Sequence, residues 1–126
     1  MIIYVSHSRE NDFKNQLYVP IRNSKLNKIH KIILPHELSP ENFSSKELFK
    51  DKCDLVIAEV SHKSTGVGIE LGWADSFGIP IIAIHKKDII PSRSIKSVTS
   101  RFVSYSNERD MILGIEKEMK RMMSEK

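Results

Sequence analysis

The stretch that decides the fold runs from Asp54 to Ala74 and reads DLVIAEVSHKSTGVGIELGWA. Its first part, residues 54–60, is a short apolar run rich in β-branched residues, which predicts a buried strand. Turn-forming residues follow from Ser61 to Gly68, and apolar residues at helical spacing then predict a helix over 68–77. A strand, a loop of small residues and a helix in this order are typical of the ligand-binding edge of an α/β protein.

Two glycines, Gly66 and Gly68, lie where the loop meets the predicted helix, and Glu70 follows in its first turn. Backbone N–H groups and a helix N-terminus meet at such a junction, and together they form a site for an anion. Two interpretations stay open on spacing alone. The segment is an active site with a carboxylate beside the ligand, or it is a glycine-rich helix start whose glutamate only complements the helix dipole.

Length and composition limit the kinds of protein that this chain can be. The chain has 126 residues, 40% of them hydrophobic and 29% charged, which predicts a single soluble globular domain over 1–126. No apolar run approaches the ~20 residues of a membrane span, so no membrane partner is expected. The apolar start Met1–Val5 lacks a basic region and a cleavage site, so it is interpreted as a strand and not as a signal peptide. The single cysteine, Cys53, excludes an internal disulfide, fits a cytoplasmic location and is expected in the core.

The net charge of +4 raises the question of a nucleic-acid partner. The basic residues are scattered along the chain, and aromatic residues do not alternate with them. A solvated basic surface is therefore the favoured interpretation, without nucleic acid as a partner. A basic protein still favours a phosphorylated substrate.

The rest of the chain alternates predicted strands and helices. Further strands are expected over 2–6, 30–34, 80–85 and 102–105. A first helix is capped by Ser8 or Asn11, and Pro20 is expected to kink it or to stop it before a second short turn. A loop is expected at Ser39–Asn42, a helix over 45–52, and one helical turn near Ser94. The last helix starts at Asn107 or Asp110, and its inward stripe comprises Met111, Ile112, Ile115, Met119 and Met122.

This alternation predicts an α/β fold, a flavodoxin-like (Rossmann-like) three-layer sandwich with a five-stranded parallel sheet. Ligands of such folds bind beyond the carboxyl ends of the strands. The loop expected at Ser6–Arg9 and the loop at Ser61–Gly68 both fall at that edge. Ser6 and Gly68 are therefore predicted to contribute to a substrate or phosphate site.

The central stretch also carries a family pattern: Ala58-Glu59-Val60-Ser61, then Ser64, then Gly66-Val67-Gly68-Ile69-Glu70-Leu71-Gly72, then Ala74. This pattern resembles the signature of the nucleoside 2-deoxyribosyltransferase-like superfamily, most closely its 2′-deoxynucleoside 5′-phosphate N-hydrolases. The resemblance implies an enzyme that cleaves the N-glycosidic bond of a (deoxy)nucleoside or its 5′-monophosphate, by hydrolysis or transfer. It implies no cofactor, and it assigns Glu70 as the nucleophile.

The same resemblance suggests how a nucleotide is held. Ser64 and Gly66 match the family residues that bind the 5′-phosphate. Ser94 falls where a serine reaches the phosphate bound by a neighbouring subunit, which implies a homodimer. Arg9 corresponds to an arginine of the first loop. For Ser94 and Arg9, an ordinary loop or surface position remains an equally open interpretation.

One departure from the family stands out. An aspartate eight residues before Asp54 would position the sugar and assist proton transfer, but Lys46 occupies that register. Glu47 or Asp51 replaces it after a small shift of the helix, or His36 or Glu37 takes the role, or the activity is altered or lost. The Ser6–Arg9 segment, which lacks the family's glycine-rich pattern, points the same way.

Two other functions compete with this one. Tyr4–Asp12 resembles the opening of a TIR domain, whose architecture is the same and whose glutamate can cleave the glycosidic bond of NAD. The Gly66–Gly68 segment favours the transferase-like family, because TIR domains usually carry a different motif there. The third candidate is a nucleotide-binding module that kept the phosphate loop and lost turnover, as the missing aspartate suggests.

No metal site is expected. The five histidines, most of them expected in loops or facing solvent, show no paired ligand spacing: His7, His30, His36, His62 and His85.

Overall fold

The computed structural model describes residues 1–10, 12–38 and 44–125. The predicted Asn11 cap and the Ser39–Asn42 loop lie outside these residues. The strands are β1 (Ile2–His7), β2 (Lys31–Ile33), β3 (Leu55–Glu59), β4 (Ile81–Lys86) and β5 (Phe102–Tyr105). The helical segments are η1 (Lys14–Tyr18), α1 (Val19–Arg22), α2 (Lys25–Ile29), α3 (Ser45–Asp51), α4 (Thr65–Ser76), η2 (Arg93–Ser97) and α5 (Glu108–Ser124).

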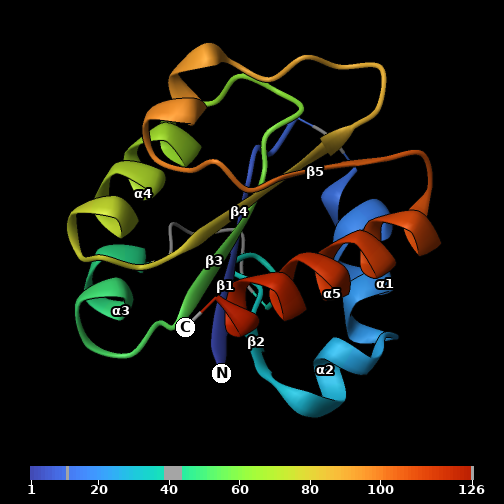
Figure 1. Cartoon of the computed structure of the whole chain (residues 1–126), viewed down its shortest axis with the longest axis horizontal. Helices are drawn as coiled ribbons and strands as arrows, with labels where there is room; N and C mark the ends of the chain where they lie inside the picture. Colours follow the sequence, from blue (N-terminus) through green and yellow to red (C-terminus); the bar gives the residue numbers. More distant parts are fainter. Residues whose placement is uncertain (11, 39–43, 126) are drawn as a thin grey trace.

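The five strands form one parallel sheet in the order β2-β1-β3-β4-β5. This is the flavodoxin-like order, and it confirms the predicted fold class. Helices cover both faces: α3 and α4 lie on one side of the sheet, and α1, α2 and α5 lie on the other (Figure 1). The strand order reverses between β1 and β3, because β2 is added on one side of β1 and β3 to β5 follow on the other side. The crevice beside these two strands is therefore the expected ligand position.

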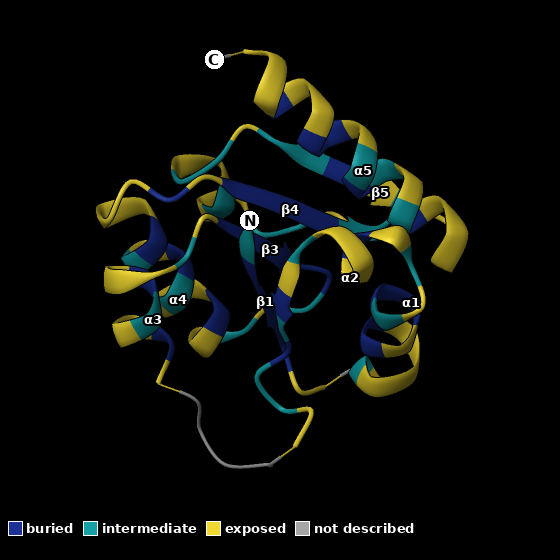
Figure 2. Ribbon diagram, turned by 90° about the horizontal axis from the view of Figure 1, so that it is seen from below, coloured by how far each residue is buried: buried dark blue, intermediate teal, exposed yellow. Residues whose placement is uncertain are grey.

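Successive residues of each strand alternate between the two faces of the sheet, so the hydrophobic core consists of two clusters, one on each face. Ile3 and Val5 of β1 pack with α5 and the η1–α2 segment, while Tyr4 between them packs with α3 and α4. Successive strand residues point to opposite faces, and both faces are covered, so the strands are nearly continuously apolar. Figure 2 shows the resulting pattern, with buried strands between helices whose outer faces are exposed.

The first helical region confirms the predicted effect of proline. A π-helical segment, η1, ends at Tyr18, and Pro20 lies in the first turn of the short helix α1 that follows. A proline is tolerated in a first turn because the N–H that it lacks has no intrahelical partner there. Residues 25–29, for which no helix was predicted, form α2; Leu26 is its one buried residue.

Two boundaries differ from the predictions in a way that matters for the site. Ser6 and His7 are the last residues of β1 and not part of a loop, since their backbones continue the pairing with β3. Helix α4 begins at Thr65, not Gly68, because the Ser64 side chain accepts a hydrogen bond from the Val67 N–H at 3.3 Å and caps the helix there. Gly66 and Gly68 are therefore helical, and Glu70 lies in the second turn rather than the first.

The remaining elements are close to expectation. The helical turn near Ser94 is η2, and β5 has the predicted bounds. Asn107 caps α5 by accepting a hydrogen bond from the Asp110 N–H at 2.8 Å. Four of the five residues in the predicted inward stripe of α5 are buried, and Ile112 is partly buried. Cys53 is half-buried against the α3–α4 core cluster, where burial raises the pKa of its thiol.

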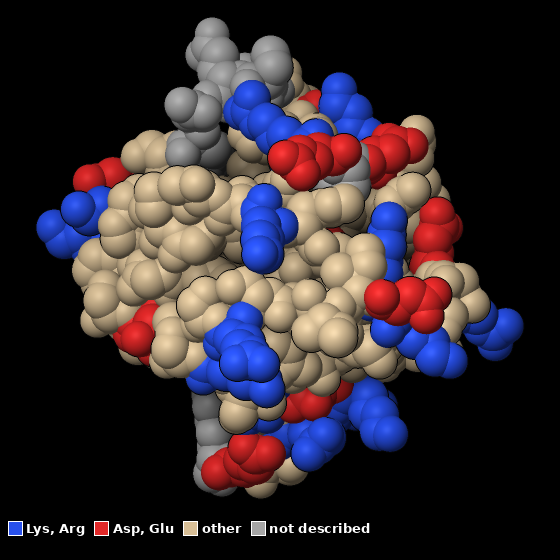
Figure 3. Space-filling view, turned by 90° about the horizontal axis from the view of Figure 1, so that it is seen from above, with Lys and Arg blue, Asp and Glu red and all other residues tan. Residues whose placement is uncertain are grey.

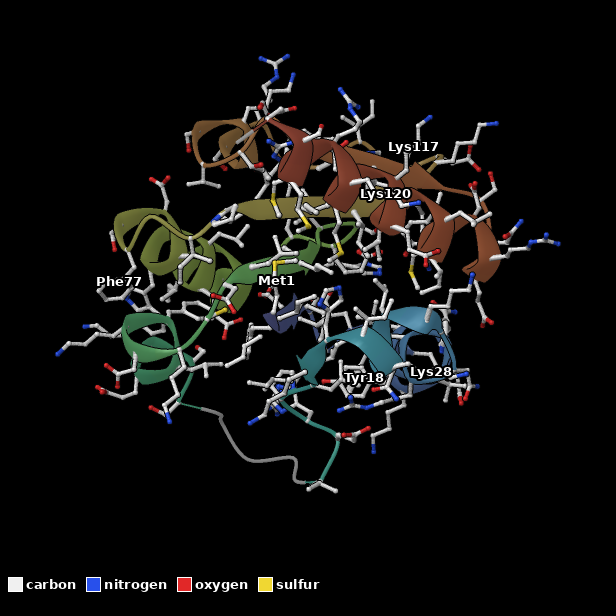
Figure 4. The ribbon with its side chains drawn as sticks, turned by 60° about the horizontal axis from the view of Figure 1, so that its bottom comes forward. Met1, Tyr18, Lys28, Phe77, Lys117 and Lys120 are labelled. Atoms are coloured by element: carbon white, nitrogen blue, oxygen red, sulfur yellow. The ribbon has the colours of Figure 1, made fainter. Side chains whose placement is uncertain are left out.

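The surface charges agree with the prediction of a scattered basic surface. Figure 3 shows acidic and basic side chains mixed over the face that it presents. Lys28 lies on α2, whereas Lys117 and Lys120 lie on α5 (Figure 4). Within the described residues, no helix has the length and apolar character needed to cross a membrane.

Helix α5 packs closely on β5, and Gly114 makes this approach possible. A Cβ atom at Gly114 would lie 2.4 Å from Cγ1 of Val103, whereas one at Gly72 in α4 would meet nothing within 4 Å. We expect Gly114→Ala to destabilise the protein by about 1–3 kcal/mol through overpacking. Gly72→Ala, the matched control, should stabilise it by about 0.5–1 kcal/mol through helix propensity. Urea unfolding measures both, and a Gly114→Ala variant as stable as Gly72→Ala would contradict this account of the packing.

Candidate active site

A cavity of about 530 Å³ opens at the carboxyl ends of β1 and β2, beside the first turns of α4. Its wall includes side chains from β1, from the segments after β1 and β2, and from α3 and α4: Tyr4, His7, Arg9, Pro35, His36, Ser45, Ser64, Gly66, Val67, Ile69, Glu70 and Trp73. This is the position predicted for a ligand in a doubly wound sheet.

Glu70 is the carboxylate of this cavity, and two hydroxyl groups hold it. The Tyr4 hydroxyl donates to Oε2 at 2.6 Å, and the Ser6 hydroxyl donates to Oε1 at 2.7 Å. Both donors are on β1, two residues apart, so they point to the face of the sheet that α4 covers. Burial, together with the neighbouring Glu70 carboxylate, raises the pKa of Tyr4, so Tyr4 remains a proton-bearing donor. Each carboxylate oxygen thus has a fixed partner, and the orientation of Glu70 is set.

The residues predicted to bind the substrate do not all lie in one cavity. Arg9, Ser64 and Gly66 line the Glu70 cavity, as the prediction of a shared site requires. Ser6 is fully buried, and its hydroxyl binds Glu70. Gly68 and Ser94 instead line a neighbouring cavity of about 330 Å³, which shares Ser64 with the first.

The three proposed auxiliary acids are not among the residues lining the Glu70 cavity. Glu37 binds Arg22 through both carboxylate oxygens, at 2.8 and 2.9 Å, and this pairing lowers the pKa of Glu37. Glu47 and Asp51 are exposed, because the residues that α3 buries are Ser45 and Phe49. Among the described residues of the wall, Glu70 is the one carboxylate.

Lys46, which occupies the register of the family aspartate, lies at the margin of the site. Its Nζ atom is 5.7 Å from the centroid of the Trp73 ring, a distance at which a cation and an aromatic face attract each other. Trp73 is part of the cavity wall. A cation therefore lies over the ring of a residue of the cavity wall.

Several residues of the wall were missed in the sequence. Tyr4 is not among the predicted site residues, although its spacing of two from Ser6 places both on one face. His7 was expected in a loop, but it is buried at the end of β1, with its ring stacked on Phe13 at a centroid distance of 4.5 Å. Trp73 lies one helical turn after Glu70, so the spacing i, i+3 was the available signal.

His7 is held as a neutral imidazole. Its Nδ1 atom lies 2.9 Å from the Ser8 carbonyl oxygen, which can only accept, so Nδ1 carries the proton. Its Nε2 atom lies 2.6 Å from the Tyr18 hydroxyl, which itself accepts a hydrogen bond from the His36 N–H at 3.0 Å. The Tyr18 proton is therefore directed to His7. Burial lowers the pKa of His7 and raises that of Tyr18 to about 12.

Among the described residues, no group of three or more His, Cys, Asp or Glu side chains could hold a metal ion.

The chain matches known proteins by structure and not by sequence. No family model and no curated protein matches the chain. Its fold is that of a solved CMP N-glycosidase. This protein, BcmB from Clostridium botulinum, is 19% identical and superposes with a TM-score of 0.66, covering 92% of this chain and 99% of its own. At this identity, the similarity shows the fold.

The buried His7 predicts a pH dependence of stability. Its pKa in the folded state lies below the unfolded value of about 6.5, so the unfolded chain binds more protons when the pH falls through that region. The free energy of unfolding should therefore decrease from about pH 7.5 to about pH 5.5, by at most about 1.4 kcal/mol per pH unit from this group.

Two measurements check this expectation. NMR titration should give the His7 ring a midpoint below about 6.5. His30 has a pKa lowered in the same direction by partial burial and by the N-terminal amino group, so a His30→Gln variant separates its contribution in urea unfolding. A His7 midpoint at or above the ordinary value would contradict the neutral, buried assignment.

Proposed function

We propose that this protein cleaves the N-glycosidic bond of a nucleoside 5′-monophosphate or a nucleoside, with Glu70 as the nucleophile. The observation that carries the proposal is the Glu70 carboxylate, the one carboxylate among the described residues of the cavity wall, which Tyr4 and Ser6 fix beside the start of α4. Support comes from the similarity in fold to a protein that acts as a CMP N-glycosidase. The resemblance of the Ala58–Ala74 pattern to the deoxyribosyltransferase-like superfamily points to the same chemistry.

The reaction needs a carboxylate next to the anomeric carbon of the sugar. In the proposed step, a Glu70 oxygen attacks C1′ while the C1′–N bond breaks and its electron pair leaves with the base. Water or a second base then takes the sugar from Glu70, giving hydrolysis or transfer. The two hydroxyl donors from β1 keep the carboxylate aligned through this step, because both of its oxygens are bound before the substrate arrives.

The start of α4 is the proposed phosphate site. Ser64 and Gly66 line the cavity at the helix N-terminus, where backbone N–H groups and the helix dipole favour an anion. Packing does not require glycine at Gly66 or Gly68: an added Cβ would lie 3.9 Å from Ser64 Oγ at the first position and in open space at the second. Glycine within a helix lowers its stability by roughly 1 kcal/mol relative to alanine, so open access for a ligand accounts for their presence here.

A homodimer remains part of the proposal. Ser94 is exposed on η2, and Ile69 of helix α4 and the C-cap residue Phe77 are exposed in addition to the apolar residues that the helix buries. A helix that is apolar on more than its core face favours a second contact surface. A neighbouring copy packed there would bring its own Ser94 to the site, as the family resemblance suggests.

The test of the proposal is the release of free base, detected by chromatography, from nucleosides, nucleoside and deoxynucleoside 5′-monophosphates and NAD. We expect wild type to release base from at least one mononucleotide or nucleoside. Glu70→Gln should lower the rate by at least about 10³-fold, as loss of a nucleophile does. Glu116→Gln on α5 is the matched control and should leave the rate unchanged. Activity that survives in Glu70→Gln would exclude the proposed nucleophile, and activity on NAD alone would favour the TIR-like alternative.

Ser64 offers a test of the phosphate site that keeps the helix intact. Aspartate caps helices as well as serine does, so Ser64→Asp should preserve α4 while adding a negative charge beside the bound phosphate. We expect the KM for a nucleoside 5′-monophosphate to rise at least about tenfold, which corresponds to ~1.4 kcal/mol. The KM for the corresponding nucleoside should change little. Equal effects on both substrates would place the phosphate elsewhere.

A further inference from the structure

Glu59 is a buried carboxylate that the proposed reaction does not use. It is the last residue of β3, and it does not line the Glu70 cavity. Glu59 is 2% exposed, and in the part of the chain that the structure describes no lysine, arginine or histidine forms an ion pair with it. Burying a carboxylate is costly unless hydrogen-bond donors surround it, so the groups around Glu59 have to be identified.

Three donors satisfy the Glu59 carboxylate. Oε1 accepts a hydrogen bond from the Ser61 N–H at 2.6 Å, and Oε2 accepts one from the Ser61 hydroxyl at 3.0 Å. The Tyr105 hydroxyl also donates to Oε2. Burial and the bond to Glu59 raise the pKa of Tyr105, so the hydroxyl keeps the proton that it donates. An ionised carboxylate has acceptors only, which is what three converging donors require.

These bonds fix Ser61 relative to three strands. Besides its two bonds to Glu59, the Ser61 hydroxyl accepts a hydrogen bond at 2.9 Å from the N–H of Lys86, the last residue of β4. Tyr105 is the last residue of β5. Glu59 therefore joins the carboxyl ends of β3, β4 and β5 through one serine and one tyrosine, and all three strands determine where Ser61 lies.

The loop between Ser61 and helix α4 is short. Its two ends, Ser61 and Ser64, are separated by at most about 10 Å of extended chain. Ser64 caps α4 through a hydrogen bond of 3.3 Å, and it lines both the Glu70 cavity and the neighbouring one. A displacement of Ser61 would therefore be passed to the start of α4, where the phosphate site is proposed.

A phosphate site depends on donors that are held in place. Groups that bind a ligand need support that keeps them within roughly 0.5 Å of the productive geometry. Glu59 and Tyr105 are not among the residues of the Glu70 cavity, so their effect on a nucleotide there passes through the 61–64 loop. An unphosphorylated nucleoside has no group to place at the start of α4, and its binding should not depend on that loop.

We propose that Glu59 and Tyr105 are positioning residues for the 5′-phosphate, which fix the 61–64 loop and thereby set the preference of the site for a phosphorylated substrate. This inference rests on the proposed function. It assigns no chemical step to either residue, since neither lines the cavity of Glu70. The expected signature is a loss of affinity confined to the phosphorylated form of a substrate, with the rate of bond cleavage unchanged.

The experiment compares a nucleoside 5′-monophosphate with the corresponding nucleoside. Tyr105→Phe removes one hydrogen bond and little volume, and we expect it to raise the KM for the monophosphate roughly three- to tenfold. The kcat for both substrates and the KM for the nucleoside should stay within about twofold of wild type. Glu59→Gln should raise the KM for the monophosphate by about tenfold or more, because its amide N–H group would face one of the three donors. Where Glu59→Gln does not fold, Tyr105→Phe carries the test.

Glu118→Gln is the matched control. Glu118 is also a buried glutamate, 7% exposed, but it forms ion pairs with Arg101 and Arg121 and takes no part in the 61–64 loop. We expect this variant to be less stable in urea unfolding and to keep the wild-type ratio of the two KM values. Tyr105→Phe and Glu59→Gln should be non-additive in a double-mutant cycle, since both remove the same hydrogen bond.

A binding measurement separates this inference from the proposed reaction. In the Glu70→Gln background, calorimetry gives the Kd of the monophosphate and of the nucleoside without turnover, and Tyr105→Phe should weaken the first alone. Equal weakening of both ligands, or unchanged binding of both in Tyr105→Phe, would overturn the positioning role while leaving Glu70 in place. Failure of wild type to release base or to bind a nucleotide would instead remove the proposed function and this inference with it.

Discussion

The site depends on the pair of hydrogen bonds that join β1 to Glu70. Tyr4 and Ser6 can both reach this carboxylate because they are two residues apart on a strand and point to the same face, and because α4 packs on that face. Buried hydroxyl groups are costly to leave without partners, so the bonds also constrain how α4 lies on the sheet. The orientation of the Glu70 carboxylate and the packing of the α4 layer are thus set by the same contacts.

The cavity draws its residues from both layers of the fold. Glu70, Ser64 and Trp73 come from the α4 side, whereas His7 is stacked on Phe13 beside η1, on the other side of β1. The central position of β1, between β2 and β3, brings the segments after all three strands to one edge. A sheet with a topological switch point has its crevice there, so both layers can contribute chemistry to one ligand.

A second buried carboxylate shows how the neighbouring loop is held. Glu59, at the end of β3, is 2% exposed and accepts hydrogen bonds from the Ser61 N–H at 2.6 Å, the Ser61 hydroxyl at 3.0 Å and the Tyr105 hydroxyl. The Ser61 hydroxyl in turn accepts from the Lys86 N–H at 2.9 Å. These bonds connect β3, β4 and β5 at the start of the loop that leads to Ser64. The phosphate-loop candidate is therefore anchored at one end by Glu59 and at the other by the Ser64 cap.

The sequence by itself determined what depends on local pattern. The order of the strands, the five-stranded parallel sheet, every helical segment but α2, and the convergence of Arg9, Ser64, Gly66 and Glu70 on one edge follow from short-range periodicity and from the rule for parallel sheets. Only the tertiary structure decided which polar groups pair. The Ser6 hydroxyl donates a hydrogen bond to Glu70, 64 positions further along the chain. Glu37 forms an ion pair with Arg22, and the buried His7 forms a hydrogen bond with Tyr18. Such pairings arise when distant segments pack together, and residue spacing along one chain carries no signal for them.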